Sequence, residues 1–295
     1  MQERMHPSTF SIVAHDPDAG EWGIAVQSKF LAAGAVVPWA KAKVGAVATQ
    51  AMANMKYGPD GLGLLSEGLS AEEVVEHLTK DDDGAPGRQL GVVDAEGRSA
   101  AFTGDECFDW AGHVTGDCYS CQGNILAGPA VVRDMASDFE QSTGRLADRL
   151  VSALRAGQAA GGDKRGQQSA GLLVVREGGS YGGTLDRYID LRVDDHDQPI
   201  EEIARLLDMF YLYFEKPDPD ALLPMEGDVA AEVIASLRQL GYDVGPAVDE
   251  VDSQVQKALD EWVGSENFEE RMIKPAFIDP QVLSYMREQA RSALE

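Results

Sequence analysis

Three β-type segments near the N-terminus constrain the fold of this chain more than any other feature. They are Thr9–Asp16, Trp22–Phe30 and Val44–Thr49, and each is a nearly continuous run of small and β-branched residues. Such runs lack the polar alternation of a strand with one face in water, so they predict strands covered on both faces. Asp16–Gly20 separates the first two, and its Pro and Gly favour a turn, so we expect a hairpin.

The later segments come in blocks of like elements. Ser70, followed three residues later by Glu73, predicts a capping box that opens a helix. The further expected elements are a hairpin of Gln89–Val93 and Arg98–Thr103, helices at Pro129–Glu140 and Leu146–Ala156, strands at Ser169–Arg176 and Tyr188–Val193, and a helix at Pro199–Phe214. Parallel βαβ winding would alternate strand and helix more strictly. The order therefore favours an α+β class with antiparallel sheets between helical layers.

A stiff, proline-spaced stretch, Lys216–Asp220, is the best candidate for a domain boundary. Beyond it, amphipathic patterns predict helices at Asp228–Leu240, at Ser253–Val263 and from Asp279 to the end. The sequence thus predicts an N-terminal extension at residues 1–8, a large domain at 9–216 and a small all-α module at 217–295.

The composition is that of a globular protein, with 44% apolar and 25% charged residues. No apolar run approaches the length of a membrane span, so we expect no membrane insertion. Met1–Pro7 contains no apolar stretch of a secretory signal, and we expect a cytoplasmic protein.

The formal net charge is −25. Such a surface repels phosphates, so nucleic acid is not an expected partner. Two interpretations of the acidity remain open. It can simply keep the protein soluble, or it can be an adaptation to high salt, where counterions screen the self-repulsion.

The chain has three cysteines, Cys107, Cys118 and Cys121, and an odd number argues against a disulfide framework. Together with His113 they would supply four zinc ligands, but the spacing is not that of a common finger or ribbon. We therefore expect burial as small apolar side chains, and predict no metal and no cofactor.

Several motifs resemble those of the domain-of-unknown-function family 1028, in order over about residues 9–215. They are Thr9–Ala14, Val26–Phe30, Gly45–Ala51, Tyr57–Pro59, Trp110–His113, Gln122–Asn124, Gly161–Gly166 and Asp190–His196. The resemblance implies an αββα sandwich of the N-terminal-nucleophile hydrolase type, an amide substrate and assembly into a homo-oligomer. The tail, with Leu240–Tyr242 and Gly245-Pro246, resembles a peptidoglycan-binding-like module.

In that fold the nucleophile is the first residue of the mature chain, and its α-amine is the base. Thr9 is the matching position, and an α-amine titrates near neutrality, as a base requires. Here Ser8 precedes Thr9, which leaves three alternatives: the chain is cut between them, the start site is misassigned, or Thr9 is an ordinary strand residue. Lys29 would either tune the charge of the amine or extend from the sheet end into water.

Further candidates are polar side chains in loops and at strand ends. The amides Gln50, Asn54, Gln122 and Asn124 suit an oxyanion hole or substrate recognition, although loop amides more often cap turns. Asp163 and Arg165 would either orient a polar substrate or form a solvated ion pair. For Asp194–His196, turn capping is favoured over metal binding, because neighbouring strand residues point to opposite faces.

Overall fold

The computed structural model describes residues 9–246 and 250–293, so the predicted extension at residues 1–8 lies outside the described residues. The chain divides into two compact units, up to Leu207 and from Asp208 onward. The division lies within helix α5, Pro199–Phe214, which Lys216–Asp220 follows. No helix of the described ranges is both long and apolar enough to cross a membrane.

The first unit contains two antiparallel sheets. Sheet A has six strands in the spatial order β10 (Arg187–Val193), β9 (Ser169–Val175), β2 (Glu21–Ser28), β1 (Thr9–Asp16), β8 (Tyr119–Asn124) and β7 (Gly112–Gly116). Sheet B has four, in the order β3 (Pro38–Lys41), β4 (Gly45–Ala51), β5 (Arg88–Asp94) and β6 (Ser99–Thr103). The sheets pack face to face over apolar side chains that include Val13, Ile24, Ala46 and Ala48.

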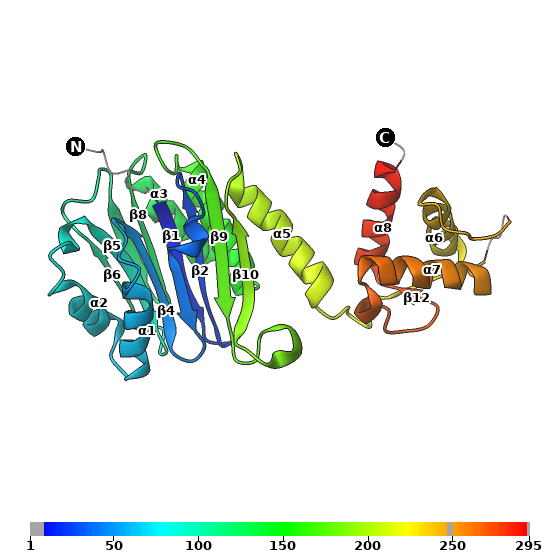
Figure 1. The fold of residues 1–295 in the computed structure, drawn as a ribbon, viewed down its shortest axis with the longest axis horizontal. Coiled ribbons are helices and arrows are strands. Elements are labelled where there is room, and N and C mark those ends of the chain that lie inside the picture. The colour runs from blue at the N-terminus through cyan, green and yellow to red at the C-terminus, as the bar shows by residue number, and fades with distance from the viewer. Residues whose placement is uncertain (1–8, 247–249, 294–295) are drawn as a thin grey trace. The chain divides into compact units, whose positions relative to one another are not determined.

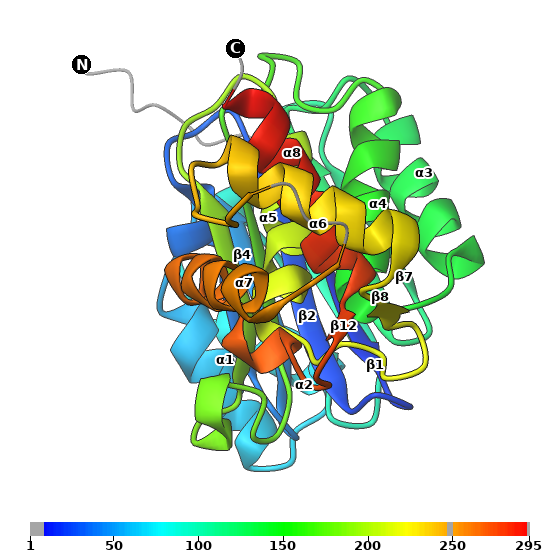
Figure 2. The same cartoon turned by 90° about the vertical axis from the view of Figure 1, so that its right-hand side faces the viewer.

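Helices cover the outer face of each sheet. Helices α1 (Tyr57–Ser66) and α2 (Ala71–Thr79) lie on sheet B (Figure 1). Leu65 of α1 and Val74 of α2 share a core cluster with Val47 of β4. On sheet A, α4 (Leu146–Ala159) lies so close that a methyl group at Gly23 would be 2.6 Å from a carbon of Leu150. Helix α3 (Ala130–Gln141) lies beside α4 and next to β7 and β8 (Figure 2). The first unit is therefore a mixed α/β structure of four layers.

The second unit is mainly helical, with α6 (Gly227–Gln239), α7 (Ser253–Glu266) and α8 (Pro280–Ser292) around a core that includes Trp262 and Phe268. It also contains a two-residue strand pair, β11 (Leu223–Pro224) with β12 (Phe277–Ile278), so the prediction of an all-α module was wrong in this detail. Single 3-10 turns lie at Ala33–Ala35, Ala85–Gly87, Tyr181–Gly183 and Glu269–Arg271.

Local sequence signals gave most of these elements. The β1–β2 hairpin, the β5–β6 hairpin and the capping box of Ser70 with Glu73 are confirmed. Four elements of the first unit were not predicted: α1, β3, β7 and β8. Of the elements missing from the prediction, strand β8 matters most, because it pairs with β1 and its last residue lies opposite Thr9.

Candidate functional site

Thr9 is the first residue of β1 and lies between the ends of two neighbouring strands. In the sheet register it is opposite Ser28, the last residue of β2, and opposite Asn124, the last residue of β8. The Thr9 and Ser28 hydroxyl oxygens are 3.2 Å apart, within hydrogen-bonding distance. Thr9 is buried, with 1% of its surface exposed.

The side chain of Thr9 faces sheet B. Its neighbour Phe10 points the other way, since a methyl group at Gly157 of α4 would be 3.3 Å from the Phe10 ring. Because successive strand residues point to opposite faces, Thr9 and Ser11 share the inner face. The apolar inter-sheet core thus gives way to polar side chains at this end of the sandwich.

Ser11 links the two sheets through two amides. Its hydroxyl donates to Gln50 Oε1 at 2.7 Å and accepts from Gln122 Nε2 at 2.7 Å. Gln122 Oε1 in turn accepts the Ser120 hydroxyl at 2.7 Å. Gln122 fits between the sheets because its neighbour across the interface is Gly91, where a methyl group would lie 2.2 Å from Gln122 Oε1.

Gln89, which no sequence motif singles out, is the hub of this network. Its Oε1 accepts from Gln50 Nε2 at 2.8 Å and from Asn124 Nδ2 at 3.0 Å. Its Nε2 donates to Thr103 Oγ1 at 2.9 Å and to two backbone carbonyls, those of Gly112 and Gly123. The amides of Gln50, Gln122 and Asn124 are thus brought together through buried hydrogen bonds, as part of one network beside Thr9.

Lys29 follows Ser28 at the end of β2, but its side chain is exposed. Its ammonium group donates to the carbonyl of Gln167 at 3.0 Å. Its backbone N–H donates to Asp163 Oδ2 at 3.0 Å. Lys29 therefore lies at the same strand end as Thr9, and its charged group is directed to the loop before β9.

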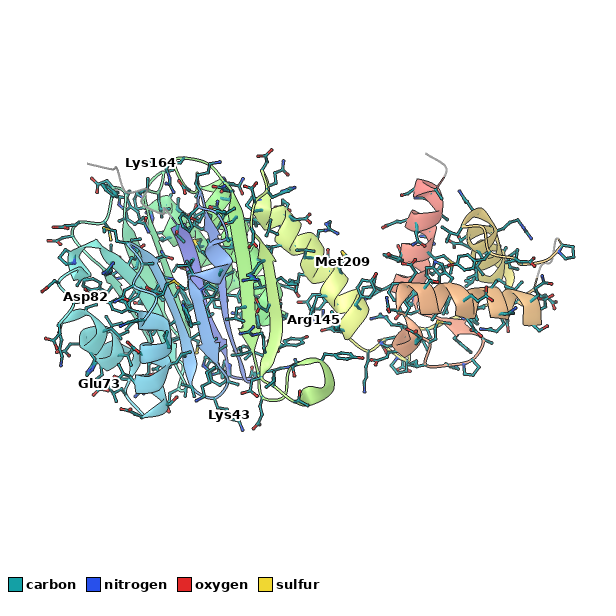
Figure 3. The ribbon with its side chains drawn as sticks, viewed as in Figure 1. Lys43, Glu73, Asp82, Arg145, Lys164 and Met209 are labelled. Carbon is teal, nitrogen blue, oxygen red and sulfur yellow. The ribbon has the colours of Figure 1, made fainter. Side chains whose placement is uncertain are left out.

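Asp163 and Arg165 form one paired unit in that loop. Asp163 is 3% exposed, and its carboxylate also accepts the backbone N–H of Arg165 at 2.8 Å and the guanidinium at 3.2 Å. The next residue, Lys164, bonds through its backbone N–H to the Ile125 carbonyl. Lys164 lies at the end of sheet A from which β1 starts (Figure 3). The loop thus borders the Thr9 edge and is held there by a buried carboxylate.

Asn54 belongs to a different polar cluster, on the α1 side of sheet B. Its Nδ2 donates to Asp82 Oδ2 at 3.4 Å, and the same oxygen accepts Tyr57 Oη at 2.7 Å and Arg88 Nε at 3.1 Å. The Tyr57 hydrogen bond, with the Arg88 guanidinium, holds the pKa of Asp82 well below its usual range. Burial, together with Asp82, raises the pKa of the Tyr57 hydroxyl. Asn54 is therefore not part of the Thr9 network.

The cysteines are free thiols. Cys121 is buried in β8, while Cys107 and Cys118 are half-buried. Burial raises the pKa of Cys107 to about 11 and raises that of Cys121 further, so these thiols are protonated at neutral pH. Within residues 9–246 and 250–293, no three His, Cys, Asp or Glu side chains are grouped as metal ligands would be.

Of Asp194–His196, for which turn capping was expected, His196 caps the turn before α5. His196 Nδ1 accepts the backbone N–H of Gln198, just before α5, at 3.0 Å. The Asp195 carboxylate accepts Gln168 Nε2 at 3.0 Å. These side chains therefore secure the connection between β10 and α5.

Comparison with known proteins agrees with the division into two units. Residues 213–286 match the model described as "Putative peptidoglycan binding domain". The crystal structure of a protein from Silicibacter pomeroyi, a member of family DUF1028, is similar at 32% identity and a TM-score of 0.63, over 76% of this chain and 92% of that one. No curated protein matches the sequence. Residues 9–203 match the model described as "Family of unknown function (DUF1028)", and the chain belongs to this family.

Proposed function

We propose that the first unit is an αββα sandwich of the N-terminal-nucleophile type and that it hydrolyses an amide, with Thr9 as nucleophile. One observation carries the proposal: the Thr9 hydroxyl is on the first residue of an inner strand, 3.2 Å from the Ser28 hydroxyl and beside a buried amide network. Cleavage between Ser8 and Thr9 would add an α-amine to the same residue. That amine, unlike a lysine ammonium, titrates near neutral pH.

The proposed reaction has two steps. Thr9 Oγ1 attacks the amide carbonyl carbon while the neutral α-amine takes the hydroxyl proton. The C–N bond then breaks as that proton passes to the leaving nitrogen, which gives a free amine and an ester on Thr9. Water, deprotonated by the same α-amine, attacks the ester carbonyl and releases the acid, and the proton returns to Thr9 Oγ1.

Ser28 and Asn124 are the proposed groups nearest the reacting atoms, because both are register partners of Thr9. Hydrogen-bond donors placed at a developing oxyanion typically lower the barrier by several kcal/mol. Gln50 and Gln122 have a positioning role in this proposal, since both are bonded within the network. Lys29 adds positive charge at the strand end.

Intact mass spectrometry of the purified full chain tests the maturation step. The expected mature species begins at Thr9. A chain that keeps residues 1–8 while it hydrolyses amides would contradict the mechanism, because no α-amine would then exist at Thr9.

Labelling with an electrophilic β-lactone tests the nucleophile. Peptide mapping is expected to find the ester on Thr9, and Thr9→Ala is expected to abolish it. Thr115→Ala is the matched control, because Thr115 is an exposed strand threonine of the same unit. Equal labelling of the Thr9→Ala protein would exclude Thr9.

The alternative is a binding protein on the same scaffold, and the match of residues 213–286 to a peptidoglycan-binding model favours it. In that case the second unit would hold a glycan polymer. A pull-down on insoluble peptidoglycan, with cellulose as a control matrix, is the measurement. The binding role would be supported over the enzyme if the chain is retained on peptidoglycan, keeps residues 1–8 and does not react with the β-lactone.

A further inference from the structure

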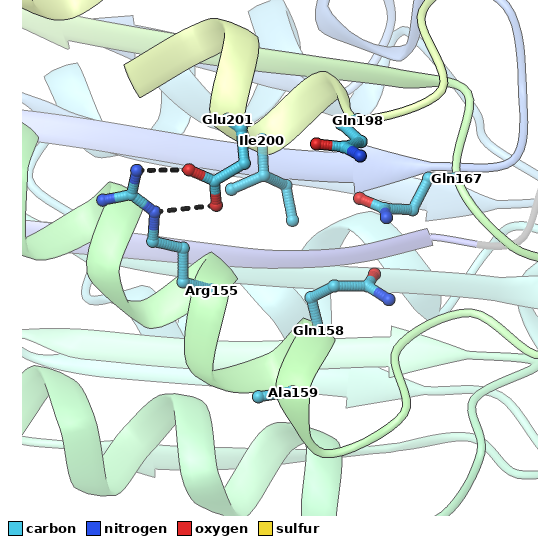
Figure 4. A pocket seen from close by; sticks show the side chains of 7 residues that line it. All are labelled: Arg155, Gln158, Ala159, Gln167, Gln198, Ile200 and Glu201. Atoms are coloured by element: carbon cyan, nitrogen blue, oxygen red, sulfur yellow. Dashed lines mark hydrogen bonds and ion pairs between the residues drawn. The ribbon is translucent and has the colours of Figure 1, made fainter. Parts of the chain in front are cut away.

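The outer side of sheet A has a surface cavity between the last turns of α4, the loop before β9 and the start of α5. Its two charged side chains, Arg155 and Glu201, are paired with each other through two hydrogen bonds (Figure 4). This pair is closed and half-exposed, so it selects no particular ligand. On the inner side of the same sheet, in contrast, a buried hydrogen-bond chain ends on an exposed histidine, His113 of β7.

This chain of hydrogen bonds crosses from one sheet to the other. Asn124 Nδ2 donates to Gln89 Oε1 at 3.0 Å, and Gln89 Nε2 donates to Thr103 Oγ1 at 2.9 Å. Thr103 Oγ1 lies 2.9 Å from His113 Nδ1. Thr103 is on β6 and His113 on β7, the edge strands of sheets B and A, so their contact joins the two sheets along one side. The register partner of Thr9, Asn124, is thus connected to the surface.

The donors and acceptors of the chain fix the protonation state of His113. Gln89 Nε2 can only donate, so Thr103 Oγ1 accepts on that side. Among the residues that the structure describes, His113 Nδ1 is then the one acceptor for the hydroxyl hydrogen of Thr103. Nδ1 must therefore be unprotonated, with the ring hydrogen on Nε2. A protonated His113 would donate from both ring nitrogens, and the Thr103 hydroxyl hydrogen would lose its acceptor.

No charged side chain of the neighbouring strands faces His113. Strands β6, β7 and β8 contain no Asp, Glu, Lys or Arg. The titratable residues of β8, Tyr119 and Cys121, alternate with Gln122 and point to the outer face, where Tyr119 bonds a carboxylate of α3. A protonated His113 would therefore have no anionic partner on these strands.

The charged groups of the adjoining segments do not stabilise the imidazolium either. On β5, Arg88 and Asp94 each form an ion pair with another residue. The connection between β6 and β7 carries further titratable groups, Asp105, Glu106, Cys107 and Asp109. A nearby acid would raise the pKa of His113, whereas partial burial of the ring lowers it below its ordinary value. Because His113 is also exposed to water, it can exchange protons with the solvent.

We propose that His113 is a positioning residue that makes the Thr9 site sensitive to pH. While His113 is neutral, it accepts from Thr103, which holds Gln89, and Gln89 holds Asn124 beside Thr9. Protonation removes the acceptor at the end of this chain and loosens the network. The effect on the reaction rests on the proposed function, but the coupling between His113 and the amides does not require Thr9 to be a nucleophile.

Nuclear magnetic resonance on the isotopically labelled full chain measures this coupling without any chemical reaction. The imidazole signals of His113 give its titration midpoint, and the carboxamide signals of Gln89 and Asn124 are expected to shift with the same midpoint. In His113→Asn these shifts should disappear, because asparagine Oδ1 can accept the same hydroxyl hydrogen but does not titrate between about pH 4 and 8. His77→Asn, at an exposed histidine of α2, is the matched control and should leave the shifts unchanged.

Labelling by the β-lactone measures the consequence for Thr9. At about pH 8, His113→Phe, which removes the acceptor, is expected to label about fivefold more slowly than His113→Asn, which keeps it; this is the loss of one hydrogen bond. As the pH falls through the pKa of His113, the wild-type rate should drop about fivefold relative to His113→Asn. The ratio of these two rates cancels the titration of the Thr9 α-amine, which both proteins share.

The two measurements separate the coupling from the hydrolase. Carboxamide signals that do not follow the midpoint of His113, or that titrate equally in His113→Asn, would overturn the coupling. A ratio of wild-type to His113→Asn labelling that stays constant with pH would overturn the positioning role. If Thr9 is never labelled while the carboxamides follow His113, the proposed hydrolase fails and the coupling stands. If His113→Phe does not fold, wild type and His113→Asn still decide both points.

Discussion

Thr9 Oγ1 and Ser28 Oγ lie 3.2 Å apart, in the last residue pair of the β1–β2 hairpin. Both residues are buried, so the contact is formed inside the sandwich. If Thr9 is the nucleophile, Ser28 is the nearest side chain that can hold its hydroxyl in one orientation.

Ser28→Ala is therefore expected to slow β-lactone labelling of Thr9 about fivefold, which corresponds to the loss of one hydrogen bond of about 1 kcal/mol. The labelling rate from intact mass spectra is the measurement. Ser66→Ala, at an exposed serine of α1, should label at the wild-type rate. An unchanged rate in the Ser28→Ala protein would remove Ser28 from the mechanism.

Gln89→Met should lower the free energy of unfolding by about 3 kcal/mol. The substitution keeps the volume of the side chain but leaves Gln50 Nε2 and Asn124 Nδ2 without their acceptor, and unpartnered buried groups cost about 1–3 kcal/mol each. Urea denaturation measures the change. Gln141→Met, at an exposed site, is the control, and a loss no larger than the control's would show that the network contributes little stability.

Asp82 makes the stability of the first unit depend on pH. Its pKa is lowered in the folded state, chiefly by the Tyr57 hydrogen bond, so its contribution is present above the unfolded pKa of about 3.9. That contribution is lost as the pH falls from there through the folded pKa. Asp82→Asn should cost about 1–3 kcal/mol at pH 7 and progressively less below pH 4.

Paired urea titrations of wild type and Asp82→Asn at pH 7, 5 and 3 check this prediction. Asp81→Asn is the matched control, because Asp81 is the neighbouring acid and is exposed. A difference between wild type and Asp82→Asn that stays constant from pH 7 to pH 3 would contradict the assignment.

Arg271 stabilises the second unit from within. It is 4% exposed, pairs with buried Asp279, and donates to the backbone carbonyls of Tyr211, Leu212 and Glu215. Arg271→Ala should cost about 3–5 kcal/mol, because it leaves a buried carboxylate without its cation.

Hydrogen exchange of amides in α7 measures that loss, with amides of β1 as an internal reference that should not change. Arg238→Ala, at an exposed arginine of α6, is the control. Unchanged protection of α7 in the Arg271→Ala protein would show that the pair adds no net stability.

The sequence by itself determined the elements whose signals are local. Ser70 and Glu73 are three residues apart and form their capping box within one helical turn. The turn at Asp16–Gly20 pairs β1 with β2 in the expected hairpin. Helix α1 was not predicted because glycines such as Gly58 lower the helix propensity of its sequence. Gly58 is needed there because a methyl group at this position would collide with the Trp39 ring, and only the packed structure shows this contact.

Only the tertiary structure decided which polar residues meet. Gln122 bonds Ser11 across 111 positions of sequence, and no local pattern encodes such a pairing. Gln89 has the same appearance in the sequence as any strand glutamine, yet it is the hub of the network. Lys29 lies at the strand end of Thr9, but its ammonium group bonds the Gln167 carbonyl, and the Asn54 carboxamide bonds Asp82; neither partner could be read from the sequence. Hydrogen bonds are short and directional, so their partners are fixed only when the two sheets have packed.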